Sequence, residues 1–453
     1  MSATKLAVIG AGWAGCVAAL ELADAGYELD LYEASRQLGG RARSLAWQDL
    51  TLDNGQHILL GAYSACLKFI ARLGISEQQA FLRLPLQMVY APGDDGMDFQ
   101  APRLPAPLHT LLALIRASGL SWSDKLALMR FSSAAQWMGW TLYEDCSVSD
   151  LLARFEQTER LCKLMWYPLC IAALNTAPEL ASARVFLAVL RDSLGAHRAA
   201  SDMLLPKLNL SALLPEACAQ ALQQAGAGIR SGQAVTQLSQ HANGDWQVHT
   251  ANSSDRYRAI VLATQAYQAQ RLLRQASLPD NSETQAEALA RLIPDYDYEV
   301  ITTCYLRYPA TVTLPRAFYA LCDQLEQKKY GQFVFDRGQL DAAQAGVLAV
   351  VISAAAASLE LAAEELSLAL ARQLSQSLGQ PVLAEPLDYK IISEKRATFS
   401  CRPGLTRPAQ ASGITGLYLA GDYTASDYPA TLEAAVRSGV AAAAALRQQP
   451  TQI

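Results

Sequence analysis

The sequence is poor in charged residues and has no excess of basic ones. Charged residues make up 17% of the 453 positions, against a usual quarter, whereas hydrophobic residues reach 51%. This composition excludes an intrinsically disordered chain. The 37 Lys and Arg against 42 Asp and Glu give a net charge of −5. We therefore expect no nucleic-acid partner, because no global positive field is present to attract a polyanion.

Paired cysteines, repeats and linkers are also missing. The nine cysteines are odd in number, scattered, and include no C-x-x-C pair. Neither a disulfide framework nor a zinc site can be read from this spacing, so we expect no metal and a reducing, cytoplasmic compartment. The longest uncharged stretch, residues 342–359, has a β-branched centre that predicts a buried strand, although its length touches the lower limit for a membrane helix.

The N-terminal residues form one compact motif that permits two interpretations. Residues 6–20 carry no charge and imitate a secretory signal with a small-residue cleavage site near Cys16. The other interpretation explains more of the residues, as a strand, a glycine-rich turn, a helix and a second strand. These predicted elements are residues 5–9, 10–15, 13–25 and 28–33. The second interpretation predicts a dinucleotide site.

The glycine spacing has a specific physical basis. Gly10 makes the tight turn, Gly12 lets backbone approach a pyrophosphate, and Gly15 lets the helix lie close to the sheet. The phosphates then meet free N–H groups at the helix N-terminus. Glu33, at the end of the second strand, would accept hydrogen bonds from ribose hydroxyls and disfavour a 2′-phosphate. The pattern predicts an adenine dinucleotide other than NADP.

Segments in three further regions of the chain resemble one known superfamily. Gly39-Gly40-Arg41 follows the second strand, and residues 416–422 form an apolar stretch ending in Gly421-Asp422 before a long Ala-rich helix. Between them, residues 229–250 alternate around an Asn-Gly hairpin turn, and residues 259–264 form an apolar strand. Together these segments are similar to the flavin amine oxidase and phytoene desaturase superfamily.

The resemblance implies an α/β fold, with FAD as cofactor. It implies a Rossmann-type FAD-binding domain built from three chain segments, with an inserted α+β substrate domain. The FAD-binding segments would be residues 1–78, 205–284 and 395–453, and the substrate-domain segments 79–204 and 285–394. The cofactor-binding residues that the resemblance and the glycine turn imply are Gly10, Gly12, Trp13, Ala14, Gly15, Glu33, Ala34, Gly39, Gly40, Arg41, Asn54, Gly55, Gln56, Val235, Gly421, Asp422, Thr431 and Leu432.

Residues 52–63 and 428–439 look most like the squalene-associated desaturase branch of that superfamily. The branch implies that reduced FAD gives hydride to the allylic carbon of hydroxysqualene, while the hydroxyl leaves as water and squalene forms. Because hydroxide is a poor leaving group, the site needs an acid and a dry pocket. His57 is the candidate acid, with the alternative that it only binds the flavin or the loop backbone. Asp53, Asp427 and Tyr428 are the fallback donors.

Partners follow from the apolar insertion and from a missing motif. Residues 100–175 are rich in Leu, Pro, Trp and Ala, which suits helices around a long isoprenoid and a peripheral contact on the inner face of the cytoplasmic membrane. Arg103, Arg116, Lys125 and Arg130 flank this run as membrane-surface cations would, although solvated helix faces explain them equally. No second dinucleotide fingerprint is present, so we expect an external electron donor.

Three alternatives remain at this point. The first is an oxidative phytoene or diapophytoene desaturase, which has the same fold and the opposite direction of electron flow. The second is an amine oxidase, for which neither an aromatic cage nor a flavin-linking cysteine can be named, since Cys401 lies well before Gly421. The third is a non-enzymatic FAD-fold module such as a prenyl-binding chaperone.

Overall fold

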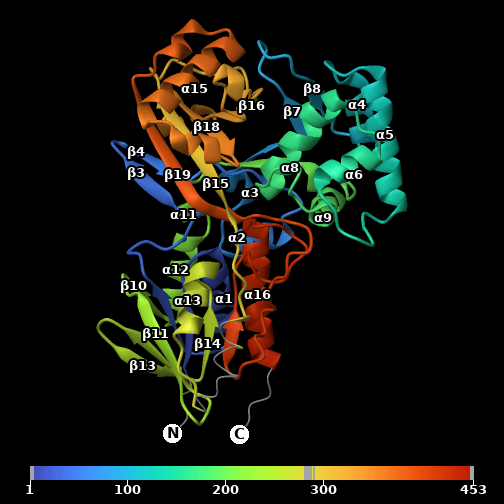
Figure 1. Ribbon diagram of the computed structural model, residues 1–453. Helices are drawn as coiled ribbons and strands as arrows, with labels where there is room; N and C mark the ends of the chain where they lie inside the picture. Colours follow the sequence, from blue (N-terminus) through green and yellow to red (C-terminus); the bar gives the residue numbers. More distant parts are fainter. Residues whose placement is uncertain (1–4, 280–287, 289–290, 449–453) are drawn as a thin grey trace.

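The structure, a computed structural model, describes residues 5–279, 288 and 291–448. A parallel sheet with its helices forms one end of the molecule, and a second sheet together with a group of helices forms the other (Figure 1). The predicted boundary between residues 284 and 285 lies outside the described residues. The remaining boundaries of the five predicted segments stay predictions.

The first sheet has five parallel strands in the order β10-β2-β1-β14-β20. Its central strands are buried on both faces and are therefore continuously apolar, as in other parallel sheets. The strands come from three separate parts of the chain, which confirms the predicted Rossmann-type fold. They are β1 (Leu6–Ile9), β2 (Leu29–Glu33), β10 (Gly228–Ser231), β14 (Ala259–Leu262) and β20 (Leu417–Leu419).

Helices α1 (Trp13–Asp24), α12 (Pro215–Gln224) and α16 (Leu432–Gln448) belong to this end of the molecule, and α1 packs against the other two. A Cβ atom at Gly439 would lie 2.4 Å from the carbonyl oxygen of Ala14, so only glycine permits this approach of α16 to α1. The predicted hairpin is also present, in an antiparallel sheet beside α13. Its strands are β11 (Val235–Gln240), β12 (Trp246–Thr250) and β13 (Ser254–Tyr257), and α13 spans Ala266–Arg274.

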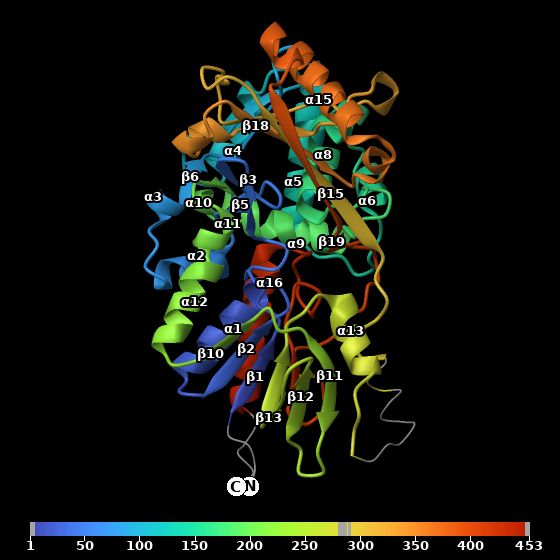
Figure 2. The same cartoon turned by 90° about the vertical axis from the view of Figure 1, so that its left-hand side faces the viewer.

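The second sheet is antiparallel, in the order β16-β17-β18-β15-β19. Figure 2 shows its long strands β15 and β19 running side by side from this sheet toward the first one. Helix α15 (Ala363–Leu378) packs on the sheet through a face of buried leucines. The strands are β15 (Tyr298–Arg307), β16 (Phe318–Ala320), β17 (Phe333–Asp336), β18 (Val347–Ser353) and β19 (Asp388–Phe399).

The structure corrects the predicted start of a helix in this region and decides what the long uncharged stretch forms. The Leu- and Glu-periodic sequence of residues 358–377 predicts a helix over that whole range. The helix begins only at Ala363, after a 3-10 turn, because Ala362 is an extended N-cap and acidic residues fill the first turn that follows it. The long uncharged stretch contains the wholly buried strand β18. Among the described residues, no helix is both long and apolar enough to cross a membrane.

The remaining insertion is mostly helical and lies beside the second sheet (Figure 1). Trp166 packs between Phe131 and Phe186 at the centre of this group. Its helices are α4 (Leu108–Arg116), α5 (Trp122–Trp137), α6 (Val148–Arg154), α7 (Glu159–Leu161), α8 (Tyr167–Leu174) and α9 (Ala183–Ser193). Short elements complete the chain: β3 (Ser44–Trp47), β4 (Leu50–Asp53), β5 (Leu59–Leu60), α2 (Ser64–Arg72), α3 (Glu77–Ala80), β6 (Phe81–Leu84), β7 (Gln87–Val89), β8 (Asp98–Gln100), α10 (Arg198–Ser201), β9 (Met203–Pro206) and α11 (Leu210–Leu213).

Candidate functional site

The turn between β1 and α1 has the geometry of an anion-binding helix N-terminus. Gly10 has φ +103°, and a Cβ at Gly15 would lie 1.8 Å from the carbonyl oxygen of Gly10, so both positions require glycine. A Cβ at Gly12 would meet no atom within 4 Å. Helix α1 has no side-chain cap and no acidic residue in its first turn. Its terminal N–H groups therefore suit a negatively charged ligand.

Glu33 lies at the end of β2, directly beside this turn. Its carboxylate accepts hydrogen bonds from the backbone N–H groups of Ala11, at 2.8 Å, and Ser35, at 2.9 Å. The backbone carbonyl of Glu33 accepts from the N–H of Gln233, which brings the segment leading to Val235 to the same edge. The structure thus places Glu33, Ala34 and Val235 in one neighbourhood, although their predicted contacts with a nucleotide stay predictions.

The glycine pair packs directly on the first turn. The N–H of Gly39 donates to the carbonyl of Ala11 at 2.8 Å, and a Cβ at Gly40 would lie 3.2 Å from the Cα of Gly12. Gly40 has φ +61°, in the left-handed region that favours glycine. The indole N–H of Trp13 donates to the carbonyl of Ala42 at 3.1 Å, which fixes the start of α1 to this loop.

Arg41 joins the N-terminal and C-terminal motifs. Its guanidinium donates to the carbonyl of Ala397 at 2.5 Å and to the carboxylate of Asp422 at 2.7 Å. Gly421 has φ +150°, and its N–H donates to the hydroxyl of Ser438 in α16 at 2.8 Å. Residues almost 400 positions apart in the sequence therefore meet at one place, as the resemblance implies.

A small cavity lies against this pair. Its lining includes Arg41, Asp422, Tyr296, Tyr298 and Tyr423. The Tyr423 hydroxyl is buried and has no hydrogen-bond partner in the described part of the chain. An unpaired buried hydroxyl costs free energy, so this atom fits a polar group of a ligand. Together with the open position at Gly12, it shows that the residues present suit a phosphate- and hydroxyl-bearing cofactor.

The start of α16 has a side-chain cap and a buried acid in its first turn. Thr431 caps the helix, because its hydroxyl accepts from the N–H of Ala434 at 3.1 Å, and Leu432 is the first helical residue. Glu433 is fully buried, and its carboxylate accepts from the N–H groups of Ala65 and Cys66 at the start of α2. The acid in the first turn of α16 therefore also caps a second helix.

His57 lies in the loop after β4, together with Asn54, Gly55 and Gln56. Its Nδ1 is 2.8 Å from the carbonyl oxygen of Gly55, so Nδ1 carries the hydrogen and donates. Burial lowers the pKa of His57, the bond to Gly55 opposes this shift, and the charge of Arg41 adds to it. Neutral imidazole therefore dominates at neutral pH, and a proton donor would have to use the minority protonated form.

The three fallback donors have different surroundings. Asp53 is buried, accepts from the N–H of Leu210 at 2.7 Å, and has its pKa raised to about 6 by burial. Asp427 is largely exposed and lies 3.9 Å from Arg191. The hydroxyl of Tyr428 already donates to Asp192 at 2.7 Å, and burial raises its pKa. Of these, only Asp53 belongs to the same loop segment as His57.

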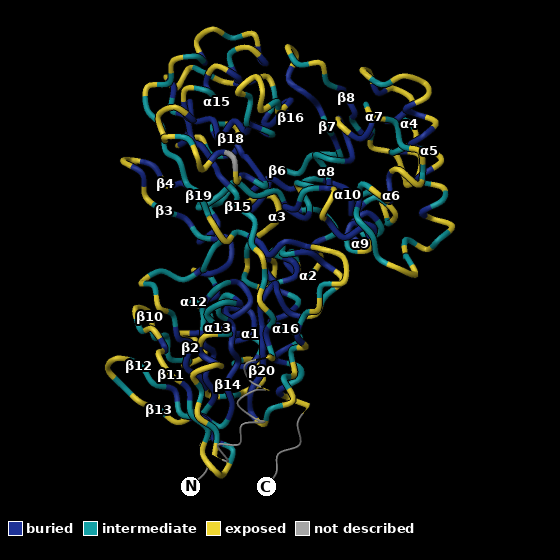
Figure 3. Tube along the Cα trace, viewed as in Figure 1, coloured by how far each residue is buried: buried dark blue, intermediate teal, exposed yellow. Residues whose placement is uncertain are grey.

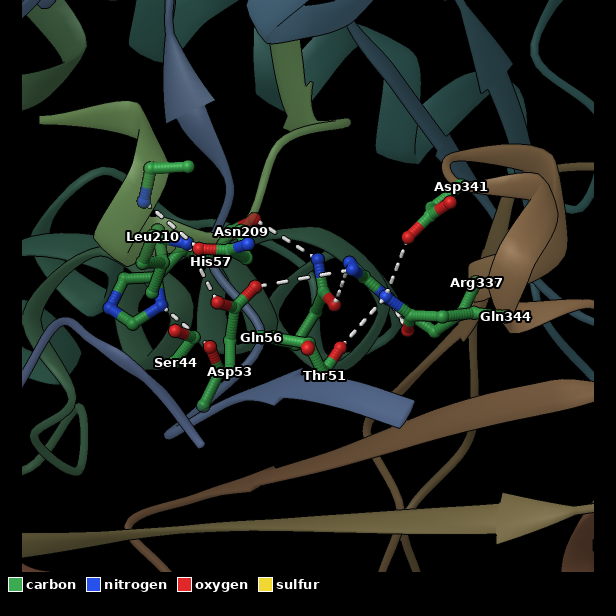
Figure 4. Close-up of polar contacts among 12 residues, drawn as sticks. Ser44, Thr51, Asp53, Gln56, His57, Asn209, Leu210, Arg337, Asp341 and Gln344 are labelled. Carbon is green, nitrogen blue, oxygen red and sulfur yellow. Dashed lines mark hydrogen bonds and ion pairs between the residues drawn. The ribbon is translucent and has the colours of Figure 1, made fainter. Parts of the chain in front are cut away.

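Two arginines at the site, the buried Arg337 and the half-buried Arg407, were not predicted from the sequence. Arg407 donates to the carbonyls of Ser426, at 2.9 Å, and Tyr428, at 2.6 Å, and also to that of Asp422, and thereby clamps the loop before α16. Arg337 reaches the loop after β4 from the second sheet (Figure 4). The one available signal for Arg337 was its place next to Asp336, at the end of an otherwise apolar strand, and nothing in the spacing marks Arg407.

The site combines a parallel sheet with a glycine-rich turn, a helix start without a side-chain cap, and a Gly-Asp pair from the distant C-terminal segment. These features define the class of FAD-dependent oxidoreductases. The chain belongs to the flavin containing amine oxidoreductase family, which matches residues 13–447. Its cofactor is accordingly FAD. This confirms the superfamily and the cofactor that the motifs implied.

The chain is also similar to individual proteins of known name over nearly its whole length. The chain is 26% identical to hydroxysqualene dehydroxylase of Sinorhizobium fredii and 28% identical to that of Rhodopseudomonas palustris, over 96% of both chains in each pair. It is 24% identical to zeta-carotene desaturase of a Synechocystis species, over 98% of this chain and 97% of that one. Among solved structures, a putative protoporphyrinogen oxidase from Exiguobacterium matches with a TM-score of 0.70 at 16% identity, over 99% of this chain and 100% of that one. This last likeness concerns the fold alone.

Proposed function

We propose that the protein catalyses the FAD-dependent reductive dehydroxylation of hydroxysqualene to squalene. The observation that carries this proposal is the similarity to hydroxysqualene dehydroxylases over 96% of both chains. In this reaction a C–O bond breaks, a C–H bond forms from a hydride, and the hydroxyl leaves with a proton as water. Reduced FAD supplies the hydride, and a donor outside this chain supplies the two electrons.

The cofactor would occupy the edge of the first sheet. The α1 N-terminus, with Gly12, Trp13, Ala14 and Gly15, would receive the pyrophosphate, supported by its missing cap. Glu33 would accept from the ribose once its carboxylate turns from the backbone groups it now binds. We assign the remaining contacts to Gly10, Ala34, Gly39, Gly40, Arg41, Asn54, Gly55, Gln56, Val235, Gly421, Asp422, Thr431 and Leu432.

His57 would deliver the proton that the leaving hydroxyl needs. Its Nε2 faces no hydrogen-bonding partner among the described residues, whereas Nδ1 is fixed by Gly55. A substrate hydroxyl at Nε2 would therefore meet an imidazole of defined orientation. Since the lowered pKa leaves little imidazolium at neutral pH, the reaction should be faster in mildly acidic solution.

An anaerobic single turnover tests the proposal. The FAD-loaded protein is reduced with dithionite, hydroxysqualene is added, and the extract is analysed by mass spectrometry while flavin absorbance is followed. We expect one squalene for each flavin reoxidised. Reduced flavin that persists beside intact hydroxysqualene would exclude the dehydroxylase function.

The second candidate is an oxidative carotenoid-type desaturase. The full-length similarity to zeta-carotene desaturase supports it. Phytoene added without oxygen to the oxidised, FAD-loaded protein would then reduce the flavin. The more conjugated product would absorb at a longer wavelength than phytoene. Parallel assays with the two substrates separate the candidates, because the required starting redox states are opposite.

We further propose that helices α4 and α5 rest on an anionic membrane surface, from which the isoprenoid enters. Among the residues that the structure describes, fourteen large hydrophobic side chains are exposed, and eight of them lie in residues 104–143. Trp122 and Trp137 are 67% and 90% exposed. Figure 3 shows this part of the chain at the outer side of the molecule, with exposed segments along α4 and α5.

The charges of the same region support an anionic partner. Residues 103–143 contain four basic side chains and one acidic one, Asp124, so their net charge is +3 in a chain of net charge −5. Asp124 is buried in the capping box of α5, whereas Arg103, Arg116 and Arg130 are exposed. Lys125 is not a membrane-surface cation as predicted, because it is buried and its ammonium donates to the carbonyl of Ile115 at 2.9 Å. Apolar and aromatic side chains flanked by cations are the combination that binds the interface of an anionic bilayer.

A further inference from the structure

Arg337 is a wholly buried charge that crosses from the second sheet to the loop carrying His57. It directly follows β17 and is 1% exposed. Its Nη1 donates to the side-chain oxygen of Gln56 at 2.9 Å, and its Nε donates to that of Gln344 at the same distance. The nearest carboxylate, Asp53, lies 4.0 Å from Nη2 (Figure 4). A buried guanidinium stays charged, so each of these contacts is held firmly.

The acceptors of Arg337 are themselves fixed. Gln344 donates to the carbonyl of Thr51 at 3.1 Å and to Asp341 at 3.2 Å. Because the Gln56 oxygen accepts from Arg337, its amide nitrogen points the other way and donates to the carbonyl of His57 at 3.3 Å. A continuous chain of hydrogen bonds therefore runs from Arg337 through Gln56 to the backbone of His57.

The second sheet holds this loop at further points. The hydroxyl of Tyr305 in β15 donates to the carbonyl of Asp53 at 2.9 Å, and the hydroxyl of Thr303 accepts from the N–H of Gln56 at 3.4 Å. Both side chains come from the strand that continues toward the first sheet (Figure 2). The sheet that would form the substrate site thus holds this loop at several points, and Arg337 supplies a charged side-chain hydrogen bond to it.

We infer that Arg337 is a positioning residue, which fixes Gln56 and His57 relative to the flavin through the paired contacts to Gln56 and Gln344. This inference rests on the proposed cofactor site and the proposed role of His57. Lysine in its place would keep the charge but could not bond two amides in the same fork geometry. Charge alone would therefore not restore the position of the loop.

The test compares Arg337→Met, Arg337→Lys and the double variant Arg337→Met with Asp53→Asn, all as FAD-loaded proteins. Arg337→Met leaves Asp53 buried beside no positive charge, so it lowers the melting temperature, and the double variant recovers it. We expect the single-turnover rate to fall at least tenfold in all three, without recovery in the double variant. The flavin absorption bands should shift in the same variants.

Recovery of both rate and stability in the double variant would overturn the inference, because Arg337 would then only neutralise Asp53. Unchanged rates and spectra in Arg337→Met would also overturn it. Arg83→Met is the matched control, since Arg83 binds Glu77 and Asp202 away from the loop and should leave the flavin bands unchanged. The flavin bands and the reduction potential test the inference even if hydroxysqualene is not the substrate.

Discussion

At the scale of single residues, burial shifts the pKa of Asp53 and the pKa of His57 in opposite directions, yet it favours the uncharged form of both. It raises the pKa of the carboxyl group to about 6 and lowers the pKa of the imidazole. Both shifts favour the uncharged form, because a low-dielectric environment penalises either charge. Asp53 would therefore change its charge state in mildly acidic solution. The site is therefore sensitive to pH in a range where most carboxylates are not.

Replacing Asp53 by asparagine should remove a pH dependence of stability. Because Asp53 has a pKa of about 6 in the folded protein and about 3.9 when unfolded, the folded state binds the proton more tightly between these values. Stability from this group is then present in acid and lost as pH rises. Between pH 4.5 and 7 the loss is about 2 kcal/mol in the wild type and absent in D53N. Urea unfolding of both proteins at the two pH values measures the difference.

The control for this measurement is Asp427→Asn, since Asp427 is 78% exposed. The D427N protein should follow the wild-type pH dependence. If the wild type and D53N lose stability in parallel between pH 4.5 and 7, Asp53 does not carry the proton. The comparison is insensitive to any constant cost of the asparagine side chain, because only the change with pH is used.

Replacing His57 by glutamine should change the pH profile of the chemical step. In the wild type, the single-turnover rate should fall as pH rises through the lowered pKa of His57, since the imidazolium is the proposed donor. H57Q should be slower by about 10² or more and should not show this limb. His109→Gln is the matched control, because burial also lowers the pKa of His109, which lies in α4 against Ser201. A wild-type limb that persists in H57Q would assign the proton to another group.

At the scale of elements, a substitution in the turn between β1 and α1 should be able to weaken cofactor binding without weakening the fold. Ala is compatible with the backbone of Gly12, at φ −69° and ψ 178°, and its methyl group would meet no protein atom within 4 Å. We therefore expect G12A to change the free energy of unfolding of the apoprotein by no more than about 0.5 kcal/mol. The same methyl group would occupy the approach of the pyrophosphate and weaken FAD binding at least tenfold. Fluorescence titration of apoprotein with FAD measures this loss.

Gly15 supplies the contrast. A Cβ there would lie 1.8 Å from the carbonyl oxygen of Gly10, so G15A should destabilise the apoprotein itself. If G12A binds FAD like the wild type, the α1 N-terminus is not the pyrophosphate site. If G12A is as unstable as G15A, the open space at Gly12 is not present in solution.

The sequence determines some elements strongly and leaves others open. The glycine turn and the apolar strands around it were predicted to within one or two residues, because each glycine is required by local backbone geometry. The start of α15 was placed too early, since Ala-rich sequence continues without a break into the preceding 3-10 turn. Arg337 and Arg407 were missed because their acceptors, mainly amide and backbone oxygens, leave no spacing pattern.

At the scale of the whole molecule, the site depends on contacts between distant parts of the chain. Arg41 with Asp422, Arg337 with Gln56, and Glu433 with Ala65 each join residues far apart in the sequence. Sequence resemblance could place Arg41 and Asp422 at one cofactor, but local patterns could not pair Arg337 with Gln56. The loop after β4 likewise depends on distant contacts, because Thr303 and Tyr305 of the second sheet bond Gln56 and Asp53.

The outer surface of α4 and α5 leads to a prediction about the whole molecule. The double variant Trp137→Ser with Leu126→Ser removes two side chains that are 90% and 54% exposed, so folding should be almost unaffected. Binding to phosphatidylglycerol vesicles, measured by co-sedimentation, should fall at least tenfold, because each apolar side chain contributes on the order of 1.5 kcal/mol when it enters the interface. Raising the salt concentration should weaken wild-type binding, since the basic residues of this region would attract the anionic lipid.

Leu387→Ser with Val382→Ser, at side chains 68% and 51% exposed elsewhere, is the matched control and should bind like the wild type. Equal losses in both double variants would show that exposed apolar area in general, and not the α4–α5 surface, governs the contact.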